Sequence, residues 1–111
     1  MKELMNIIHN EQEFKDATMV EGQNVFVFSA NWCPDCRFLE GFIKEVIDEY
    51  SAKGFHFNYV DRDDNIELCQ ELMIMGIPSF VIFKEGKEVS RFVSKLRKTR
   101  VEIEKFLNEA I

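Results

Sequence analysis

The sequence predicts an α/β protein with a central mixed β-sheet flanked by helices on both faces. Three observations support this fold class. Strand-like and helical segments alternate along the chain, the helical segments carry apolar residues at helical spacing, and the last two strand-like segments are separated by a tight turn. Each step between parallel strands needs a helical crossover. The order β-α-β-α, followed by a hairpin and a helix, therefore gives a mixed sheet with both faces covered.

The first three elements lead into and out of a turn that contains two cysteines. Residues 10–20 are expected to form a short helix with Asn10 as its N-cap. Residues 24–30 are β-branched, aromatic and nearly all apolar, which is typical of a central strand covered on both faces. After the turn, residues 38–50 carry a full apolar stripe at helical spacing, and Gly41 within them is expected to be a bend or a close-packing point.

The next segments alternate between strand and helix and end in a hairpin. Residues 55–60 alternate aromatic and polar side chains and predict a strand, and residues 65–73 predict a shorter helix. Residues 79–83 form a second apolar strand. The turn at residues 85–86 then leads into residues 88–92, which gives a β-hairpin.

The last element is a helix that begins at a capping box made by Thr99 and Glu102. Four of its apolar residues are expected to face the core: Val101, Phe106, Leu107 and Ile111. No repeat or linker interrupts the chain, so residues 1–111 are expected to form a single domain, as the length also suggests.

The charge balance excludes some classes of function. Fourteen Lys and Arg residues against twenty Asp and Glu residues give a formal net charge of −6. An acidic chain lacks the positive field on which non-specific nucleic-acid binding depends, so no nucleic-acid partner is expected. No apolar run approaches the roughly 20 residues that span a bilayer, and the N-terminal segment mixes charges into its apolar stretch. We therefore expect no membrane association and a cytoplasmic location, where thiols are kept reduced.

Three cysteines are too few for a disulfide scaffold, but the motif Cys33-Pro34-Asp35-Cys36 has the spacing of a redox or metal site. Cys33 is expected at the N-cap of the following helix and Pro34 at its first position. Free backbone N–H groups at this end of a helix favour a thiolate, so Cys33 is the expected nucleophile. Cys36, one turn further along, can close a disulfide with it. The pair is suited to thiol–disulfide exchange, with Cys36 as the resolving thiol.

Asp35 is expected to tune this site. A carboxylate ~7 Å from the Cys33 sulfur opposes the thiolate by about 0.6–1.2 kcal/mol. This penalty makes the dithiol more reducing, and we interpret the site as a reductant. The alternative is that Asp35 only stabilises the first turn of the helix.

A zinc site is the main rival interpretation, and it needs two further ligands. Only Cys69, His9, His56 and scattered carboxylates remain, and none has the spacing of a second ligand pair. A purely structural pair of reduced cysteines is a second rival. Redox activity is the favoured interpretation, and no metal is expected.

Several segments together resemble the thioredoxin family. Residues 28–37, Phe-Ser-Ala-Asn-Trp-Cys-Pro-Asp-Cys-Arg, resemble its active-site segment. Residues 60–65, 76–80 and 83–87 resemble its Val-Asp-Val-Asp-Glu-Asn, Ile-Pro-Thr and Phe-Lys-x-Gly segments, in the same order. The similarity covers about residues 10–110 and implies a thioredoxin fold.

The resemblance also implies how a substrate is held. Pro78 is expected in the cis conformation beside the two sulfurs, which leaves the Ile77 backbone free to pair with a substrate strand. Trp32 is expected to cover the site, and the segment around Val93 and Ser94 to form a third wall. The alternatives are an ordinary strand-start proline at Pro78 and a partly buried aromatic at Trp32.

The chain also departs from the family pattern. Val27 stands where many thioredoxins carry a buried Asp that takes up the proton of the second cysteine. Pro34 and Asp35 replace the glycine and proline of the usual motif, Gly41 replaces a proline, and Met73 replaces a glycine. A narrower substrate range than that of a general thioredoxin is therefore expected.

The sequence thus predicts a cytoplasmic, monomeric thiol–disulfide oxidoreductase that acts mainly as a disulfide reductase through Cys33 and Cys36. Its expected substrates are disulfides in proteins or small molecules. Its expected electron donor is a thioredoxin-reductase-type flavoenzyme or a low-molecular-weight thiol, and no cofactor is expected beyond the Cys33–Cys36 disulfide. The alternatives are a binding module with vestigial redox activity and an oxidase or isomerase. Cys69 is expected to be a small buried apolar residue, with a regulatory thiol as the alternative.

Overall fold

In the computed structural model, which describes residues 1–111, the chain forms one five-stranded sheet with helices on both faces. In chain order the elements are η1 (Lys2–Leu4), β1 (Asn6–Ile8), α1 (Glu11–Thr18), β2 (Gln23–Ser29), α2 (Pro34–Phe38), η2 (Leu39–Gly41), α3 (Ile43–Ser51), β3 (Phe55–Asp61), α4 (Ile66–Glu71), β4 (Ser79–Lys84), β5 (Lys87–Phe92) and α5 (Arg100–Asn108), where η marks a 3₁₀-helix.

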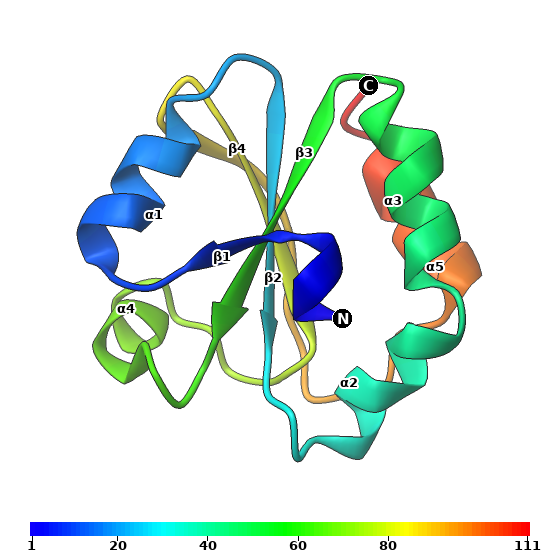
Figure 1. Cartoon of the computed structure of the whole chain (residues 1–111), viewed down its shortest axis with the longest axis horizontal. Coiled ribbons are helices and arrows are strands. Elements are labelled where there is room, and N and C mark those ends of the chain that lie inside the picture. The colour runs from blue at the N-terminus through cyan, green and yellow to red at the C-terminus, as the bar shows by residue number, and fades with distance from the viewer.

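The strand order β1-β3-β2-β4-β5 places β2 at the centre of the sheet (Figure 1). Strand β2 runs parallel to β3 and antiparallel to β4, and β1 runs parallel to β3. Strands β4 and β5 form the antiparallel hairpin. The expected mixed sheet with helices on both faces is confirmed. Because β2 has a neighbour on each edge and helices on each face, its carboxyl end delivers the following turn to a well-defined position.

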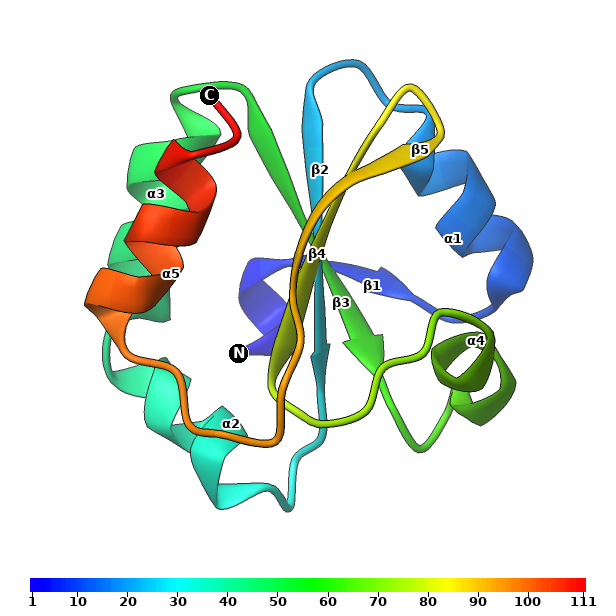
Figure 2. The same cartoon turned by 180° about the vertical axis from the view of Figure 1, so that it is seen from behind.

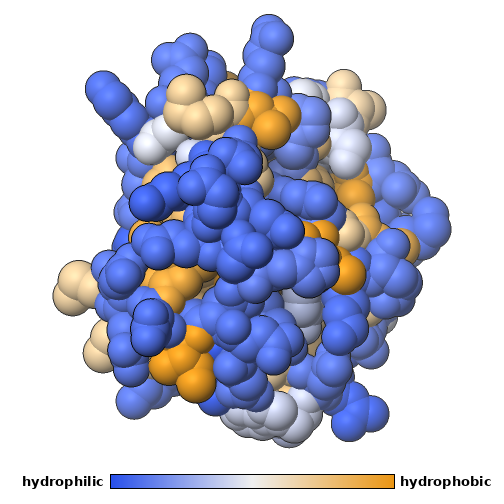
Figure 3. Space-filling view, turned by 60° about the vertical axis from the view of Figure 1, so that its left-hand side comes forward, coloured by the Kyte–Doolittle hydropathy of each residue, from blue (hydrophilic) through white to orange (hydrophobic).

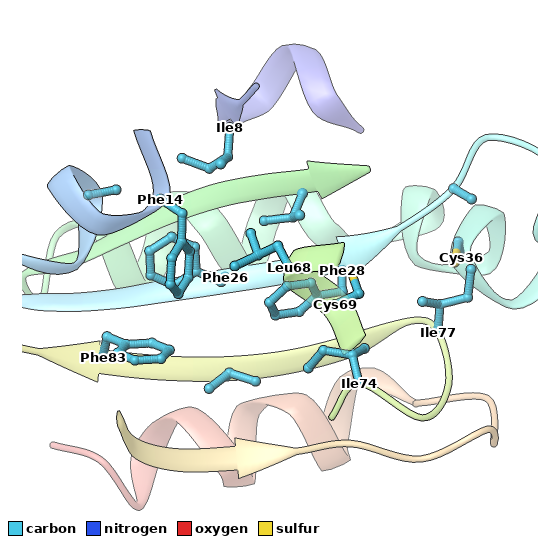
Figure 4. Close-up of a cluster of buried hydrophobic side chains, with 14 of the residues drawn as sticks. Ile8, Phe14, Phe26, Phe28, Cys36, Leu68, Cys69, Ile74, Ile77 and Phe83 are labelled. Atoms are coloured by element: carbon cyan, nitrogen blue, oxygen red, sulfur yellow. The ribbon is translucent and has the colours of Figure 1, made fainter. Parts of the chain in front are cut away.

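Helices α1 and α4 cover one face of the sheet, and α2, α3 and α5 lie on the other side (Figures 1 and 2). Each face has its own apolar cluster. The cluster beneath α1 is centred on three aromatic rings, Phe14, Phe26 and Phe83, whose centroids lie 4.7–5.6 Å apart. The same cluster extends along the sheet to Cys36 and Ile77 (Figure 4). The hydrophobic core therefore continues up to the dithiol turn.

The apolar stripe over residues 38–50 does not belong to one continuous helix. The chain forms the short helix α2, a 3₁₀ turn at η2 and then α3. A Cβ added at Gly41, the last residue of η2, would meet no atom within 4 Å. Gly41 is therefore a bend, and the close-packing interpretation is wrong.

Strand β1 was not expected from the sequence. Its three residues pair with the end of β3, and Asn6 Nδ2 donates a hydrogen bond to Asn58 Oδ1 at 2.9 Å. Asn58 Nδ2 donates in turn to the Val25 carbonyl at 3.2 Å. Asn58 is buried, and these two hydrogen bonds satisfy its side-chain amide. A segment of three residues is too short to show a periodic pattern.

Side-chain caps begin two of the helices, and a two-residue turn closes the hairpin. The Asn10 side chain caps α1, and Thr99 and Glu102 form the expected capping box at α5. Glu85 and Gly86 join β4 to β5 with positive φ angles of 53° and 79°, the conformation of a tight hairpin turn.

Two of the four residues expected to pack α5 against the core do not do so. Val101 is 77% exposed and Ile111 is 73% exposed. The buried stripe of α5 has the spacing of one helix face and consists of Ile103, Phe106 and Leu107. Val101 is two positions from that stripe and points away from it, since neighbours on a helix face are three or four residues apart. Ile111 lies beyond the end of α5.

Polar side chains dominate the face that Figure 3 shows, with only small apolar patches between them. None of the helices combines the length and the apolar character needed to cross a lipid bilayer.

Candidate active site at the dithiol turn

The two cysteines of the motif lie where β2 leads into α2. Cys33 is the N-cap of α2 with extended backbone angles, and Pro34 occupies the first turn. The Cys33 N–H donates to the Ala30 carbonyl at 3.3 Å, and the Cys33 carbonyl accepts from the Arg37 N–H at 3.0 Å. Proline suits this place because its missing N–H would have had no partner within the helix. Only five residues follow before the 3₁₀ turn, so the helix dipole at Cys33 comes from a short helix.

Both cysteines are free thiols and both are largely buried. Cys33 is 6% exposed and Cys36 is 1% exposed. Burial raises the pKa of the Cys36 thiol to about 12, and the nearby Ser29 hydroxyl and Ala30 backbone partly oppose this. Cys33 therefore presents the accessible sulfur, and Cys36 is held as a neutral thiol beneath it.

A second segment approaches the dithiol from the start of β4. The peptide bond between Ile77 and Pro78 is cis, and the Cys33 thiol lies 3.9 Å from the Ile77 carbonyl oxygen. The Ser79 hydroxyl donates to the Gly76 carbonyl within the same turn. Figure 4 shows Cys36 and Ile77 close together at one end of the hydrophobic cluster. The structure thus brings together residues more than 40 positions apart in the sequence, as a substrate-docking surface requires.

Trp32 directly precedes Cys33 and is 57% exposed. Its indole Nε1 donates to Asp63 at 2.6 Å, and the Arg62 guanidinium carbon lies 5.1 Å from its ring centroid. These contacts fix the ring in position while its outer face stays open to solvent. A largely exposed aromatic ring next to a reactive sulfur is suited to contact a partner.

Asp35 is paired with a residue that the sequence analysis did not single out. Arg97 Nε donates to Asp35 Oδ1 at 2.9 Å, and the Arg97 guanidinium carbon lies 4.4 Å from the Phe38 ring centroid. Asp35 is therefore not the isolated negative charge that the sequence suggested. A cation 2.9 Å away offsets much of the carboxylate's field at the Cys33 sulfur.

Lys98 is the second residue that the sequence analysis missed. Its side chain is fully buried, and its ammonium donates to the Ser94 carbonyl, the Ser94 hydroxyl and the Leu96 carbonyl at 2.9–3.2 Å. It also lies 5.2 Å from the Phe92 ring centroid. Burial lowers the pKa of the Lys98 ammonium, and the two active-site cysteines are among the groups that oppose this. Lys98 ties down the loop after β5, which was expected to form the third wall of the docking surface.

The remaining candidates lie outside this site. Cys69 is one of the buried residues of α4, and burial raises its pKa to about 11. Val27 is fully buried among apolar side chains. No group of three His, Cys, Asp or Glu side chains is arranged to hold a metal ion. A surface hollow of about 890 Å³ lies against α1 and β3 and includes neither Cys33 nor Cys36.

Comparisons with known proteins support the resemblance seen in the motifs. A family model described as Thioredoxin matches residues 5–109. The chloroplastic thioredoxin X of Arabidopsis thaliana is 35% identical over 80 residues, which cover 71% of this chain and 43% of that protein. A thioredoxin of Mus musculus is 29% identical over 91 residues, which cover 80% of this chain and 85% of that protein. The chain thus spans less than half the length of the first relative and most of the second.

Solved structures show the same fold. The structure of Plasmodium falciparum thioredoxin superposes with a TM-score of 0.84, covering 96% of this chain and all of that one. Its sequence identity is 20%, so this likeness concerns the fold alone.

Proposed function

Since the chain belongs to the thioredoxin family of thiol–disulfide oxidoreductases, we propose that it acts as a protein-disulfide reductase through Cys33 and Cys36. The observation that carries this proposal is the position of the Cys33 thiol, at the start of α2 and 3.9 Å from the Ile77 carbonyl. A nucleophilic sulfur beside a backbone segment that can pair with an extended chain is suited to attack a disulfide in a docked polypeptide.

The reaction proceeds in two exchange steps. The Cys33 thiolate attacks one sulfur of the substrate disulfide, and the other substrate sulfur leaves and takes up a proton. Cys36 then attacks the Cys33 sulfur of the mixed disulfide, the Cys33–Cys36 disulfide forms, and the second substrate sulfur is released as a thiol. The protein dithiol is oxidised by two electrons and the substrate disulfide is reduced.

Three segments make up the docking surface in this proposal. Trp32 contributes an exposed ring, Ile77 and Pro78 contribute a backbone edge, and the loop around Val93 and Ser94 contributes the third side. A partner extended across this surface would pass directly over the Cys33 sulfur. The Arg97–Asp35 pair lies at the same rim and adds charged groups that favour some partners over others.

A reducing partner must regenerate the dithiol after each turnover. We assign this role to a thioredoxin-reductase-type flavoenzyme or a low-molecular-weight thiol, acting on a monomer of this chain. A cytoplasmic location belongs to the same proposal, because the third cysteine, Cys69, is an unpaired thiol that is best preserved where thiols stay reduced.

A binding module with weak redox activity is the second candidate. Val27 offers no acid to take up the proton of the resolving thiol, and the raised pKa of Cys36 disfavours its thiolate. Reduction of insulin by the protein with dithiothreitol separates the two functions. Turnover above the dithiothreitol blank supports the reductase, and its absence supports the binding module.

Trapping with cysteine variants tests the roles of the two thiols. In a Cys69→Ala background, Cys36→Ser should accumulate mixed disulfides with substrate proteins, because the resolving thiol is gone. Cys33→Ser, the matched control, should accumulate none. Equal trapping by the two variants would reject the assignment of Cys33 as nucleophile. The substrates captured by Cys36→Ser can then be identified by mass spectrometry.

A further inference from the structure

The Ser29 hydroxyl is a buried polar group at the end of β2, directly before the dithiol turn. The residue is fully buried, and its Oγ has no hydrogen-bond partner in the protein. A buried hydroxyl without a partner costs stability, and native proteins keep few of them. Its neighbours along β2, Val25 and Val27, show that an apolar residue would fit this environment. The hydroxyl therefore calls for a role other than packing.

The register of β2 and β3 places Ser29 beside one other hydroxyl, that of Tyr59. Val27 pairs with Tyr59, and Ser29 pairs with Asp61. Residues two apart on a strand share a face, so the Ser29 and Tyr59 side chains lie on the same face of the sheet as diagonal neighbours. Cys36 lies in the first turn of α2, and four residues separate the end of β2 from the start of that helix. Tyr59 and Cys36 are 2% and 1% exposed.

The charges around these three side chains point the same way. Burial raises the pKa of both Cys36 and Tyr59, and the nearby Ser29 hydroxyl is the largest influence that favours the ionised form of each. The other ionisable groups that influence Cys36 or Tyr59 are Cys33, Glu40, Asp61 and Lys98. Position 27, where many thioredoxins carry a buried Asp, holds a valine here, so no carboxylate at that position can take up the Cys36 proton.

We propose that the Ser29 hydroxyl donates a hydrogen bond to the Cys36 sulfur as it becomes a thiolate in the resolving step. The Tyr59 hydroxyl, the other polar group at Ser29, can donate to Ser29 Oγ and so leave the Ser29 proton directed at the sulfur. Ser29 would thereby stabilise the developing thiolate by donation, where a buried acid would promote it by accepting the proton. This inference rests on the proposed reductase function.

The step balances without a further reactant. Cys36 loses its proton to solvent, and its sulfur forms a bond with the Cys33 sulfur. The bond between Cys33 and the substrate sulfur breaks, and its electron pair leaves with that sulfur, which takes up a proton from solvent. Ser29 keeps its own proton throughout, so its contribution is a hydrogen bond to charge that develops on sulfur.

Reaction with dithiobis(nitrobenzoate) separates the two exchange steps in one experiment. In a Cys69→Ala background, attack by Cys33 releases the first coloured thiolate, and attack by Cys36 on the resulting mixed disulfide releases the second. Stopped-flow absorbance follows both phases. We expect Ser29→Ala to leave the first phase unchanged and to slow the second.

The size of the effect follows from the chemistry of thiolates. If loss of the hydrogen bond raises the pKa of Cys36 by one unit, the fraction of Cys36 present as thiolate falls about tenfold. The more basic thiolate is about threefold more nucleophilic, which offsets part of that loss. The net slowing is about three- to fourfold per unit, and about tenfold for two units. The ratio of the variant rate to the wild-type rate should stay constant between about pH 6 and pH 9, since burial raises the pKa of Cys36 to about 12 and keeps its thiol protonated over that range.

Two controls distinguish this role from a structural one. Ser29→Ala removes an unpartnered buried hydroxyl, so its thermal stability should equal or exceed that of the wild type while its second phase is slower. Asn24→Ala, on the same strand but remote from the dithiol, should lower stability and leave the second phase unchanged. Tyr59→Phe should slow the second phase less than Ser29→Ala does.

An unchanged second phase in Ser29→Ala would overturn the inference, as would equal slowing of both phases. A larger effect from Tyr59→Phe than from Ser29→Ala would also overturn the assignment of Ser29 as donor. A wild-type protein that shows no second phase would instead reject the proposed reductase function.

Discussion

Gly76 lies where the two loops that flank the dithiol touch, and replacing it should disturb both. A Cβ added at Gly76 would overlap the Ser94 carbonyl oxygen and would lie 2.7 Å from the Lys95 Cα and N atoms. All three atoms are backbone, so no side-chain rotation relieves the contact. The backbone angles of Gly76 are not left-handed, which means that alanine fits the local conformation and only the contact is at issue. Gly76→Ala therefore pushes the loop after β5 away from Ile77 and Pro78.

The structure sets the size of this effect. Ordinary contacts of a Cβ begin near 3.4 Å, so the loops must separate by about 0.7 Å or more. Overpacking of this kind typically costs about 1–3 kcal/mol. With an unfolding entropy of about 2.1 cal/mol/K per residue, that cost lowers the melting temperature of a 111-residue protein by about 4–13 °C. Two walls of the docking surface also move apart, so we expect KM for protein disulfides to rise by about three- to tenfold.

Thermal denaturation by circular dichroism and insulin-reduction kinetics measure the two effects. Gly41→Ala is the matched control, because a Cβ there meets nothing within 4 Å. That control should keep or slightly raise the melting temperature, since alanine is a better helix former than glycine, and it should leave KM unchanged. A melting temperature and KM for Gly76→Ala within error of the wild type would refute the steric argument.

Three further predictions concern the core, the third thiol and the rim of the site. Leu107→Ala should lower the free energy of unfolding in urea by about 2–5 kcal/mol because the side chain is fully buried, whereas Val101→Ala should change it by less than about 0.5 kcal/mol; similar losses would contradict the burial pattern of α5. Burial raises the pKa of Cys69 to about 11, so the stability that its neutral thiol contributes is present below the ordinary thiol pKa and is lost as the pH rises toward 11. In urea titrations between about pH 8 and pH 11, Cys69→Ala should reduce the fall in the free energy of unfolding with rising pH. A fall equal to that of the wild type would contradict a contribution from Cys69. Arg97→Gln leaves the Asp35 carboxylate unpaired, so alkylation of the dithiol by iodoacetamide should slow about threefold at low salt and by less in high salt. A slowing that salt does not change would mean that the effect is not electrostatic.

The elements around the dithiol could be predicted from the sequence because their signals are local. A long apolar strand, a proline directly after the first cysteine and an apolar stripe are each visible within about ten residues. The hairpin and the cap of the last helix have equally local signals in Glu85-Gly86 and Thr99. Only the break of the helix after α2 is less clear, since a single glycine, Gly41, interrupts an otherwise regular stripe.

The contacts that modify the site's chemistry could not be predicted in the same way, because they join distant segments. Asp35 and Arg97 are 62 positions apart, and they meet only because the loop after β5 returns to the start of α2. Lys98 resembles any surface lysine in the sequence, and its burial depends on carbonyl groups supplied by a folded loop. Ser29 is a single small polar residue at the end of an apolar strand, and nothing in the sequence around it indicates a functional role. Its importance depends on the register of β2 with β3, which places it beside Tyr59.

The burial of Lys98 makes it a built-in reporter of motion beside the active site. An amine-reactive acylating reagent modifies lysines that solvent can reach, and Lys98 is the only lysine whose side chain is fully buried, with three oxygen acceptors around its ammonium. Acylation at Lys98 therefore requires the loop after β5 to open. The rate of its labelling, compared with that of the neighbouring Lys95, would follow how often the third wall of the docking surface detaches, and a bound substrate that holds the wall in place would slow it.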